Sequence, residues 1–186
     1  MAKKIIPPIH LACSVDDNRI SQQYIKIEKG IAYATEGHIM VLVNLKHHSD
    51  LAEEVINALD GKYVHMDTWK KIMDAELITL EDNEIVYLYG LTKAKFEIAE
   101  DINFPNVKDV LNPILNSDNK STDRIAFRPK FTDVFNKIFN SGELHFIFKE
   151  HSNAILVYPC VGAYQYGLIM PIAENEPYEF EFDISS

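Results

Sequence analysis

The sequence predicts an α+β fold built from repeated β-α-β-β-β units. Two observations predict this architecture. Residues 62–100 contain a short β run, an amphipathic helix and three further β runs, and residues 124–171 repeat that order. Three strand-like runs at residues 20–28, 31–36 and 38–45 precede the first copy, as the remnant of another unit.

The composition is that of a globular protein. With 186 residues, of which 47% are hydrophobic and 11% aromatic, the chain can bury a substantial core. It has neither a basic-apolar leader nor an apolar run of about 18 residues, so we expect a cytoplasmic protein without membrane contact. Cys13 and Cys160 lack CxxC or Cys/His spacing, which favours two small buried side chains over a disulfide or a metal site.

The N-terminal third is predicted to be mostly β. Pro7-Pro8 disfavours regular structure before residue 18. The run at residues 20–28 then alternates apolar and polar residues, and two apolar, β-prone runs follow it, with turns at Lys29-Gly30 and around Gly37. Residues 51–60 have helical spacing, which predicts a short connecting helix. The adjacent residues His47-His48 point apart and have no carboxylate cluster nearby, which favours a solvated turn over a metal site.

Residues 62–100 form the first complete unit. The run YVHM predicts a strand, Asp67 is the expected N-cap, and Trp69, Ile72 and Met73 share one face of a short helix. The runs AELITL, EIVYLYG and TKAKFEIAE predict three strands. Residues 101–123 are rich in Asn, Asp, Ser and Pro, which predicts a linker.

The second unit follows the linker. RIAF predicts a strand, Pro129 suits the start of a helix, and an apolar stripe continues along it: Phe131, Val134, Phe135, Ile138 and Phe139. LHFIFKE, NAILVYP and AYQYGLIMPI predict three strands. Residues 174–186 alternate aromatic and acidic side chains, which is typical of an edge strand, with a docking peptide as the alternative.

Motifs for catalysis are absent from the sequence. It contains no GxxxxGK[ST], no nucleophile elbow, no HExxH and no paired-carboxylate motif, and glycine is scarce at 7 residues. We therefore expect a protein that is not an enzyme, with no catalytic residues, no metal and no cofactor.

Four segments, in order, resemble the bacterial DNA polymerase sliding clamp, the DNA polymerase III beta subunit family. They are ATEGHIMV, NFPNVKDVLNP, NAILVYP and YGLIMPI. Ile39 stands where the family usually has Arg, and Val107 replaces an aromatic residue. On ATEGHIMV by itself, an ordinary hairpin with a stray His is the alternative.

The resemblance implies the DNA clamp fold in a shortened form, with antiparallel sheets on the outside and short helices on one face. It divides the chain into a clamp-like domain at residues 1–115, made of a truncated unit 1–61 and a second unit 62–115, followed by a third unit at 116–186 with an acidic tail. The chain is about half as long as a full bacterial clamp subunit. A homo-oligomeric ring would therefore need more copies than the dimer of the family, and the alternative is a chain that forms no ring.

The resemblance also implies a function: a clamp-like processivity factor that binds duplex DNA weakly and non-specifically. The alternative is a clamp-fold adaptor or regulator that does not encircle DNA. The balance of 18 basic and 28 acidic residues, net −10, opposes bulk binding to nucleic acid, but a ring needs positive charge only on its inner surface. The DNA-binding candidates lie on the polar faces of the two helices or just before one of them: Lys70, Lys71, Arg128, Lys130 and Lys137. The alternative is that these cations merely solubilise the helices, and Asp74 and Asp133 dilute their charge.

The second implied site is a hydrophobic cleft that receives a short linear peptide of a DNA polymerase or another replication or repair protein. The residues that match its walls are Thr35, Gly37, His38, Met40, Pro105, Val110, Leu168, Met170 and Pro171. Methionine and proline make an adaptable apolar surface, and Thr35 and His38 offer polar groups for a peptide. The alternative is that the apolar members are core and the prolines are turn formers.

Overall fold

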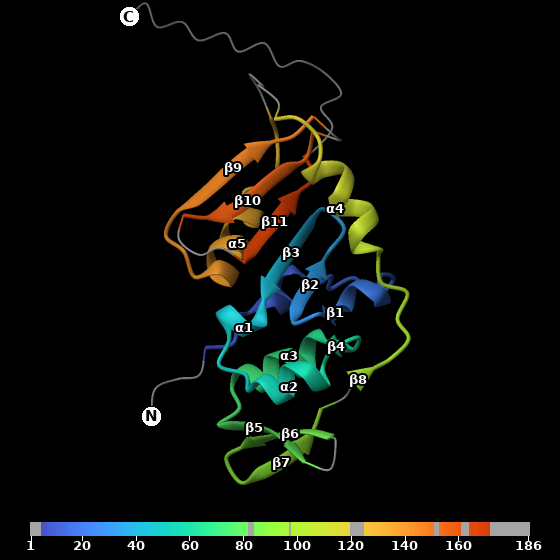
Figure 1. Ribbon diagram of the computed structural model, residues 1–186, viewed down its shortest axis with the longest axis vertical. Coiled ribbons are helices and arrows are strands. Elements are labelled where there is room, and N and C mark those ends of the chain that lie inside the picture. Colours follow the sequence, from blue (N-terminus) through green and yellow to red (C-terminus); the bar gives the residue numbers. More distant parts are fainter. Residues whose placement is uncertain are drawn as a thin grey trace, which may run out of the picture.

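A computed structural model describes residues 5–81, 84–96, 98–119, 125–150, 153–160 and 164–171. Its centre is an eight-stranded antiparallel sheet with the strand order β8-β4-β1-β2-β3-β11-β10-β9 (Figure 1). A separate three-stranded sheet has the order β5-β6-β7. The predicted α+β class, with antiparallel sheets and a few short helices, is confirmed.

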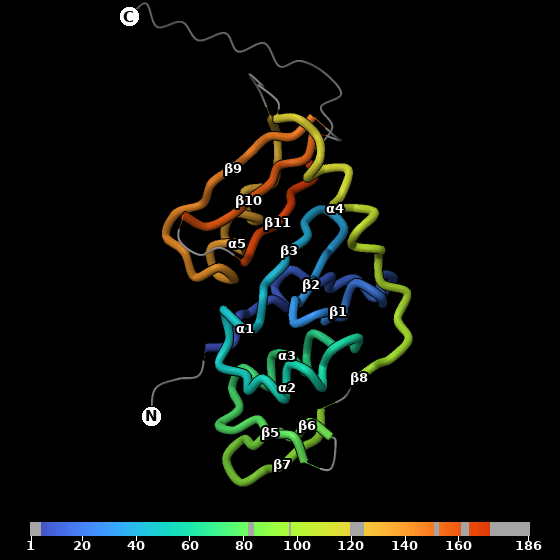
Figure 2. The backbone as a smooth tube through the Cα atoms, in the orientation of Figure 1, coloured from blue at the N-terminus to red at the C-terminus, as the bar shows by residue number. Residues whose placement is uncertain are grey.

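The first three strands lie within the three β-prone runs predicted for this region. They are β1 (Tyr24–Glu28), β2 (Ile31–Thr35) and β3 (Ile39–Asn44). Residues 20–23, predicted as the start of a strand, instead form the 3-10 helix η2 (Ile20–Gln23). Another 3-10 helix, η1 (Ile9–Ala12), follows Pro8, and its Ile9 and Ala12 are fully buried. Figure 2 shows this N-terminal segment passing across the region of β2 and β3, so it is part of the core.

Two short helices and a longer one connect β3 to the small sheet. They are α1 (Leu45–His48), α2 (Glu53–Ala58) and, after β4 (Tyr63–His65), α3 (Met66–Met73). His47 and His48 thus end a helical turn, and His47 stacks on Tyr164 with a ring-centroid distance of 4.0 Å. The predicted N-cap of α3, Asp67, is wrong by two residues: His65 is the cap, and its side chain accepts a hydrogen bond from the backbone N–H of Asp67.

The predicted strand at residues 92–100 is two strands. The small sheet contains β5 (Leu77–Glu81), β6 (Glu84–Tyr89) and β7 (Thr92–Lys95), whereas β8 (Ile98–Ala99) leaves it and pairs with β4 in the large sheet. The buried side chain of Phe96 lies at the break. The order β-α-β-β-β is present, but its strands are shared between two sheets.

The linker predicted at residues 101–123 is wrong, because it contains the helix α4 (Val107–Leu115). Asn106 caps it by accepting from the backbone N–H of Lys108. Pro113 lies inside the helix, and its ring removes one backbone donor. The apolar side chains Val107, Leu111 and Ile114 are buried against the large sheet, and that packing stabilises a helix with an unfavourable local composition.

The C-terminal part contains α5 (Lys130–Phe139), β9 (Leu144–Phe148), β10 (Ile155–Pro159) and β11 (Gln165–Ile169). The strand predicted for RIAF is wrong where it is described, since residues 125–128 have no regular structure. β11 pairs with β3 over five residues, from Gln165 opposite Val43 to Ile169 opposite Ile39. This pairing joins the N- and C-terminal strands into one sheet. The strand or docking peptide predicted at residues 174–186 lies outside the described residues.

The large sheet is buried on both faces. Ile39, Val41 and Val43 face one apolar cluster with α3, α5 and η1, and Met40 and Leu42 face a second cluster under α4. Figure 1 shows α4 alongside β3 and β11, and α5 behind β10 and β11. We call these two sides the helix face, with α3 and α5, and the α4 face.

Candidate functional site

The tetrad Thr35-Glu36-Gly37-His38 forms the turn between β2 and β3. The hydroxyl of Thr35 donates to the Ile39 carbonyl at 2.6 Å and accepts from the Gly37 N–H at 3.0 Å. Gly37 has φ +98°, which glycine adopts without strain. Thr35 is buried, and its hydroxyl is occupied within the turn.

The next strands bring four of the predicted cleft residues together. Met40 on β3 is directly opposite Leu168 on β11, and both are buried in the cluster under α4. Val110 on α4 and Met170, just after β11, pack against the same cluster and are partly exposed. Met40 and Leu168 therefore form an apolar floor, and Val110 and Met170 provide apolar surface that solvent reaches.

The remaining predicted cleft residues lie in different surroundings. Pro105 and Pro171 are half-buried where the chain enters α4 and leaves β11. The ring of His38 lies on the helix face, where it stacks on Phe131 of α5 with a centroid distance of 6.5 Å. The backbone carbonyl of His38 accepts from the Met170 N–H at 2.8 Å. The turn thus contributes its backbone toward Met170 and its imidazole toward α5.

A groove of about 230 Å³ borders α4, and the sequence did not predict it. Ile31, Tyr33, Leu42, Leu111 and Tyr166 are among its lining residues. Burial raises the pKa of Tyr33 to about 12 and also raises the pKa of Tyr166, so both phenols are neutral hydrogen-bonding groups. The signal for a covered second face was present in the unbroken apolar run of β3, because a strand with one wet face alternates instead.

The predicted DNA-binding cations lie on or next to helices that share one face. α3 buries Trp69 and α5 buries Phe135 in the same core, which leaves Lys70, Lys71 and Lys137 exposed on their outer sides. Arg128 and Lys130, at the start of α5, are also exposed. The structure therefore collects all five cations on the helix face.

Carboxylates reduce the positive charge of this face. Asp67 pairs with Lys70 at 3.0 Å, and the lysine lowers the pKa of that carboxyl. Asp74 and Asp133 are exposed at the end of α3 and in the first turn of α5. The positive charge of this face is therefore partly neutralised.

None of the helices in the described ranges combines the length and the apolar character that crossing a bilayer requires. Within those ranges, no three His, Cys, Asp or Glu side chains are gathered so that they can hold a metal ion.

No protein-family model and no curated protein matches the chain. Solved structures of bacterial sliding clamps do match. The DNA polymerase sliding clamp of Bacillus subtilis has a TM-score of 0.58 and 13% identity, over 92% of this chain and 64% of that clamp. The DNA polymerase III beta subunit from Pseudomonas aeruginosa has a TM-score of 0.59 and 13% identity, over 89% of this chain and 62% of that subunit. The DNA polymerase III beta subunit from Thermotoga maritima has a TM-score of 0.57 and 14% identity, over 88% of this chain and 61% of that subunit.

The chain thus spans 61% to 64% of the length of these three clamps. Similarity at this level of identity establishes the fold. The chain has the DNA clamp fold, in a form shorter than these bacterial sliding clamps.

Proposed function

We propose that the protein is a sliding clamp-like processivity factor, which binds duplex DNA through its helix face and a short partner peptide through its α4 face. It carries no chemistry of its own. The observation that carries the proposal is that the two faces of one sheet differ in character, one cationic and the other apolar. Exposed cations gather around α3 and α5, and an apolar floor with the accessible side chains of Val110 and Met170 lies on the other side.

Binding to DNA through the helix face would be sequence-independent, because lysine and arginine at helix surfaces contact phosphates and not base edges. The test is duplex affinity at low salt for the double variant Lys70→Glu/Lys137→Glu. We expect an affinity loss of about tenfold or more, since each lost phosphate contact reduces counterion release.

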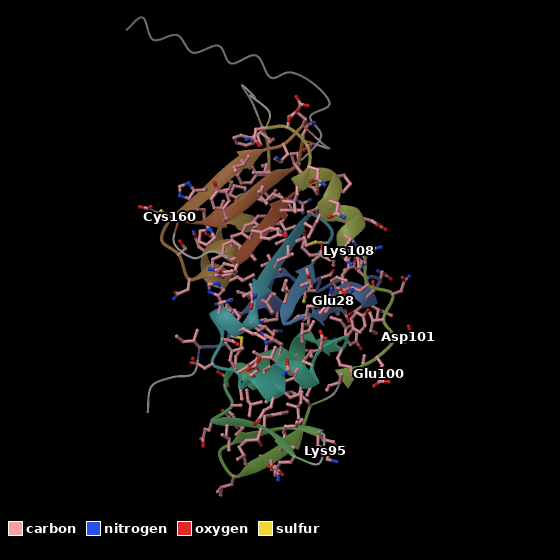
Figure 3. The ribbon with its side chains drawn as sticks, viewed as in Figure 1. Glu28, Lys95, Glu100, Asp101, Lys108 and Cys160 are labelled. Carbon is pink, nitrogen blue, oxygen red and sulfur yellow. The ribbon has the colours of Figure 1, made fainter. Side chains whose placement is uncertain are left out.

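The matched control is Lys95→Glu/Lys108→Glu, which changes the charge equally on β7 and α4 (Figure 3). It should bind DNA with a much smaller loss. Equal losses in the two double variants would show a bulk charge effect and no specific face. Unchanged DNA binding in Lys70→Glu/Lys137→Glu, with a retained fold as measured by circular dichroism, would contradict DNA binding through the helix face.

Peptide binding through the α4 face is the second part of the proposal. A fluorescent peptide of the kind that bacterial clamps bind should dock with roughly micromolar affinity, about −8 kcal/mol. Met170→Ala should weaken it about tenfold, or about 1.4 kcal/mol, without unfolding the chain. Met73→Ala, a half-buried methionine on α3, is the control and should leave the affinity unchanged.

The proposed partner is a DNA polymerase or another replication or repair protein, and the proposed assembly is a homo-oligomeric ring. A closed ring requires a symmetric oligomer. Light scattering in solution tests this, with a defined oligomer as the expected result.

An adaptor or regulator that uses the peptide surface without encircling DNA is the second candidate. The pairing of Asp67 with Lys70 and the net charge of −10 favour it, because both reduce the attraction for DNA. A strict monomer with intact peptide binding would support it.

A further inference from the structure

A crevice of about 500 Å³ opens on the helix face, between the β2–β3 turn and the start of α5. Cationic groups from two parts of the chain line it, Arg19 before η2 and the neighbours Arg128 and Lys130 at the start of α5, with the imidazole of His38 beside them. Apolar side chains line it as well. Leu11 is 38% exposed and Val15 is 83% exposed, so the crevice has uncovered hydrophobic surface next to its cations.

The cations of the crevice are only partly neutralised. Arg19 lies 3.8 Å from a carboxylate oxygen of Asp16 and donates to the Glu36 carbonyl at 2.9 Å. Lys130 lies over the Phe131 ring at 5.2 Å. Neither Arg128 nor Lys130 forms an ion pair with any residue that the structure describes. Two cations therefore remain for an anionic group from elsewhere.

The described chain leaves the sheet beside the β2–β3 turn, which borders this crevice. The Met170 N–H donates to the His38 carbonyl at 2.8 Å, and the ring of His38 lines the crevice. The residues that follow are rich in acidic and aromatic side chains: Glu174, Glu176, Tyr178, Glu179, Phe180, Glu181, Phe182 and Asp183. Residues 172–186 contain no lysine or arginine.

We propose that residues 174–186, the acidic segment, dock into this crevice of the same chain. The carboxylates of the segment pair with Arg128 and Lys130, and its aromatic rings cover Leu11 and Val15. Reach is not limiting, because residues 172–177 extended span about 20 Å. A short connection also gives the segment a high effective concentration, on the order of millimolar.

An acidic and aromatic peptide fits the crevice better than a nucleic acid phosphate does. The exposed side chains of Leu11 and Val15 gain from burial under aromatic rings but gain nothing from a phosphate group. Asp16 and Glu36, which also line the crevice, repel a phosphate backbone that cannot avoid them. A flexible peptide can place its carboxylates away from these groups.

Docking would also regulate the DNA binding proposed above, and this part rests on that proposal. The segment and the duplex would compete for Arg128 and Lys130, so that the segment lowers the affinity for DNA. A partner that removes the segment from the crevice would raise it.

The docking is tested in the full chain by photo-cross-linking. Phe180→benzoylphenylalanine should cross-link within one chain to residues 11–19 or 128–134, identified by mass spectrometry of the digested protein. Leu91→benzoylphenylalanine, at an exposed position between β6 and β7, is the control and should not label those residues. Arg128→Glu/Lys130→Glu should reduce the cross-link severalfold, whereas Lys70→Glu/Lys71→Glu, with the same charge change on α3, should not.

Each other outcome overturns the proposal. Cross-links between two chains would make a second copy the occupant, cross-links to residues 107–115 would place the segment at α4, and no cross-link would show that it does not dock. These readouts do not depend on DNA, so a failure of DNA binding leaves the docking result intact.

The regulatory part has its own experiment. Glu179→Gln/Glu181→Gln/Asp183→Asn should raise the affinity for duplex DNA about three- to tenfold at low salt. The control Glu54→Gln/Glu76→Gln/Asp109→Asn removes the same number of charges from exposed positions in the described chain and should change the affinity less. Equal changes in DNA affinity in both variants would show that only net charge matters, and would overturn the proposed competition between the segment and the duplex.

Discussion

The ring of Phe135 on α5 lies directly over Gly167 on β11: a Cβ atom at position 167 would be 2.1 Å from Cε1 of that ring. Phe135 is fully buried, and Gly167 pairs with both Val157 of β10 and Val41 of β3. The glycine allows the helix to approach the strand that joins the two parts of the large sheet.

Gly167→Ala should therefore destabilise the protein, because the added methyl group and the ring cannot share one position. Such overpacking typically costs about 1–3 kcal/mol in the free energy of unfolding. Urea denaturation measures it. Gly142→Ala is the matched control, since no atom lies within 4 Å of its added Cβ, and it should change stability by less than about 0.5 kcal/mol. Equal stability of the two variants would mean that α5 sits farther from β11.

The second prediction concerns the buried aromatic side chains of α3 and α5 and their contribution to stability. Trp69 and Phe135 are fully buried, as predicted, and Trp69 Nε1 also donates to the Pro7 carbonyl at 2.9 Å. Trp69→Ala and Phe135→Ala should each lower the free energy of unfolding by about 3–5 kcal/mol. Leu91→Ala, at a fully exposed position, should have no measurable effect in the same denaturation experiment.

The stability of the protein should decrease between about pH 6.5 and pH 4 because of His10. Burial, reinforced by Lys70, lowers the pKa of His10 from 6.5 to about 4, against a smaller opposing effect of Asp67. Above pH 6.5 both states are neutral and the residue contributes nothing. As the pH falls below that value, the unfolded chain binds a proton that the folded chain does not, so unfolding is favoured.

Thermal denaturation across this range, compared with a His10→Gln variant, measures the effect. The melting temperature of the variant should change less between pH 6.5 and pH 4 than that of the unmodified protein. The carboxyls with lowered pKa values, such as Asp67 and Glu28, lose their stabilising contribution only below about pH 4.5, which separates the two windows. Parallel profiles for the two proteins would assign the loss to groups other than His10.

The two cysteines should differ in reactivity. Burial raises the pKa of Cys13 to about 12, and its thiol is enclosed in the core. Cys160 is exposed at the outer end of β10 (Figure 3), although a hydrogen bond with Glu143 raises its pKa. Iodoacetamide should therefore modify Cys160 and spare Cys13 in the native protein, and modify both in denaturant. Native labelling of Cys13 would show that the segment around η1 opens.

The expectation that both cysteines are buried is thus correct for Cys13 and wrong for Cys160. Sequence spacing favoured a small buried side chain at each position over a shared metal site, but it did not show which of the two positions the tertiary structure leaves exposed. Cys160 follows the last residue of β10, and only the position of that strand in the sheet exposes it.

Several elements could be predicted because their signal is local. The stripe from Phe131 to Phe139 has helical spacing, and α5 buries four of its five members, Phe131, Phe135, Ile138 and Phe139. β1 alternates half-buried and buried residues as its sequence does. The turn at Gly37 requires a positive φ, which glycine supplies. In each case neighbouring residues determine the conformation.

The helix α4 depended on tertiary structure. Asn106, Asp109, Asn112 and Pro113 gave its sequence the composition of a linker, although Val107, Val110, Leu111 and Ile114 have helical spacing. A short helix is marginal alone, and this one is stabilised by burial against Met40, Leu42 and Leu168. Those residues come from strands more than 100 positions apart in the sequence, so no local pattern shows the surface on which α4 packs.

The candidate site divides in the same way. Sequence determined which residue types flank the turn, which side chains are apolar and where the cations lie along each helix. Tertiary structure decided that Met40 and Leu168 meet across two strands, and that the ring of His38 points toward Phe131 and away from them. The reason is physical: a side chain's position along a strand fixes its face, but the antiparallel pairing of β3 with β11 and the packing of α5 fix what that face contacts.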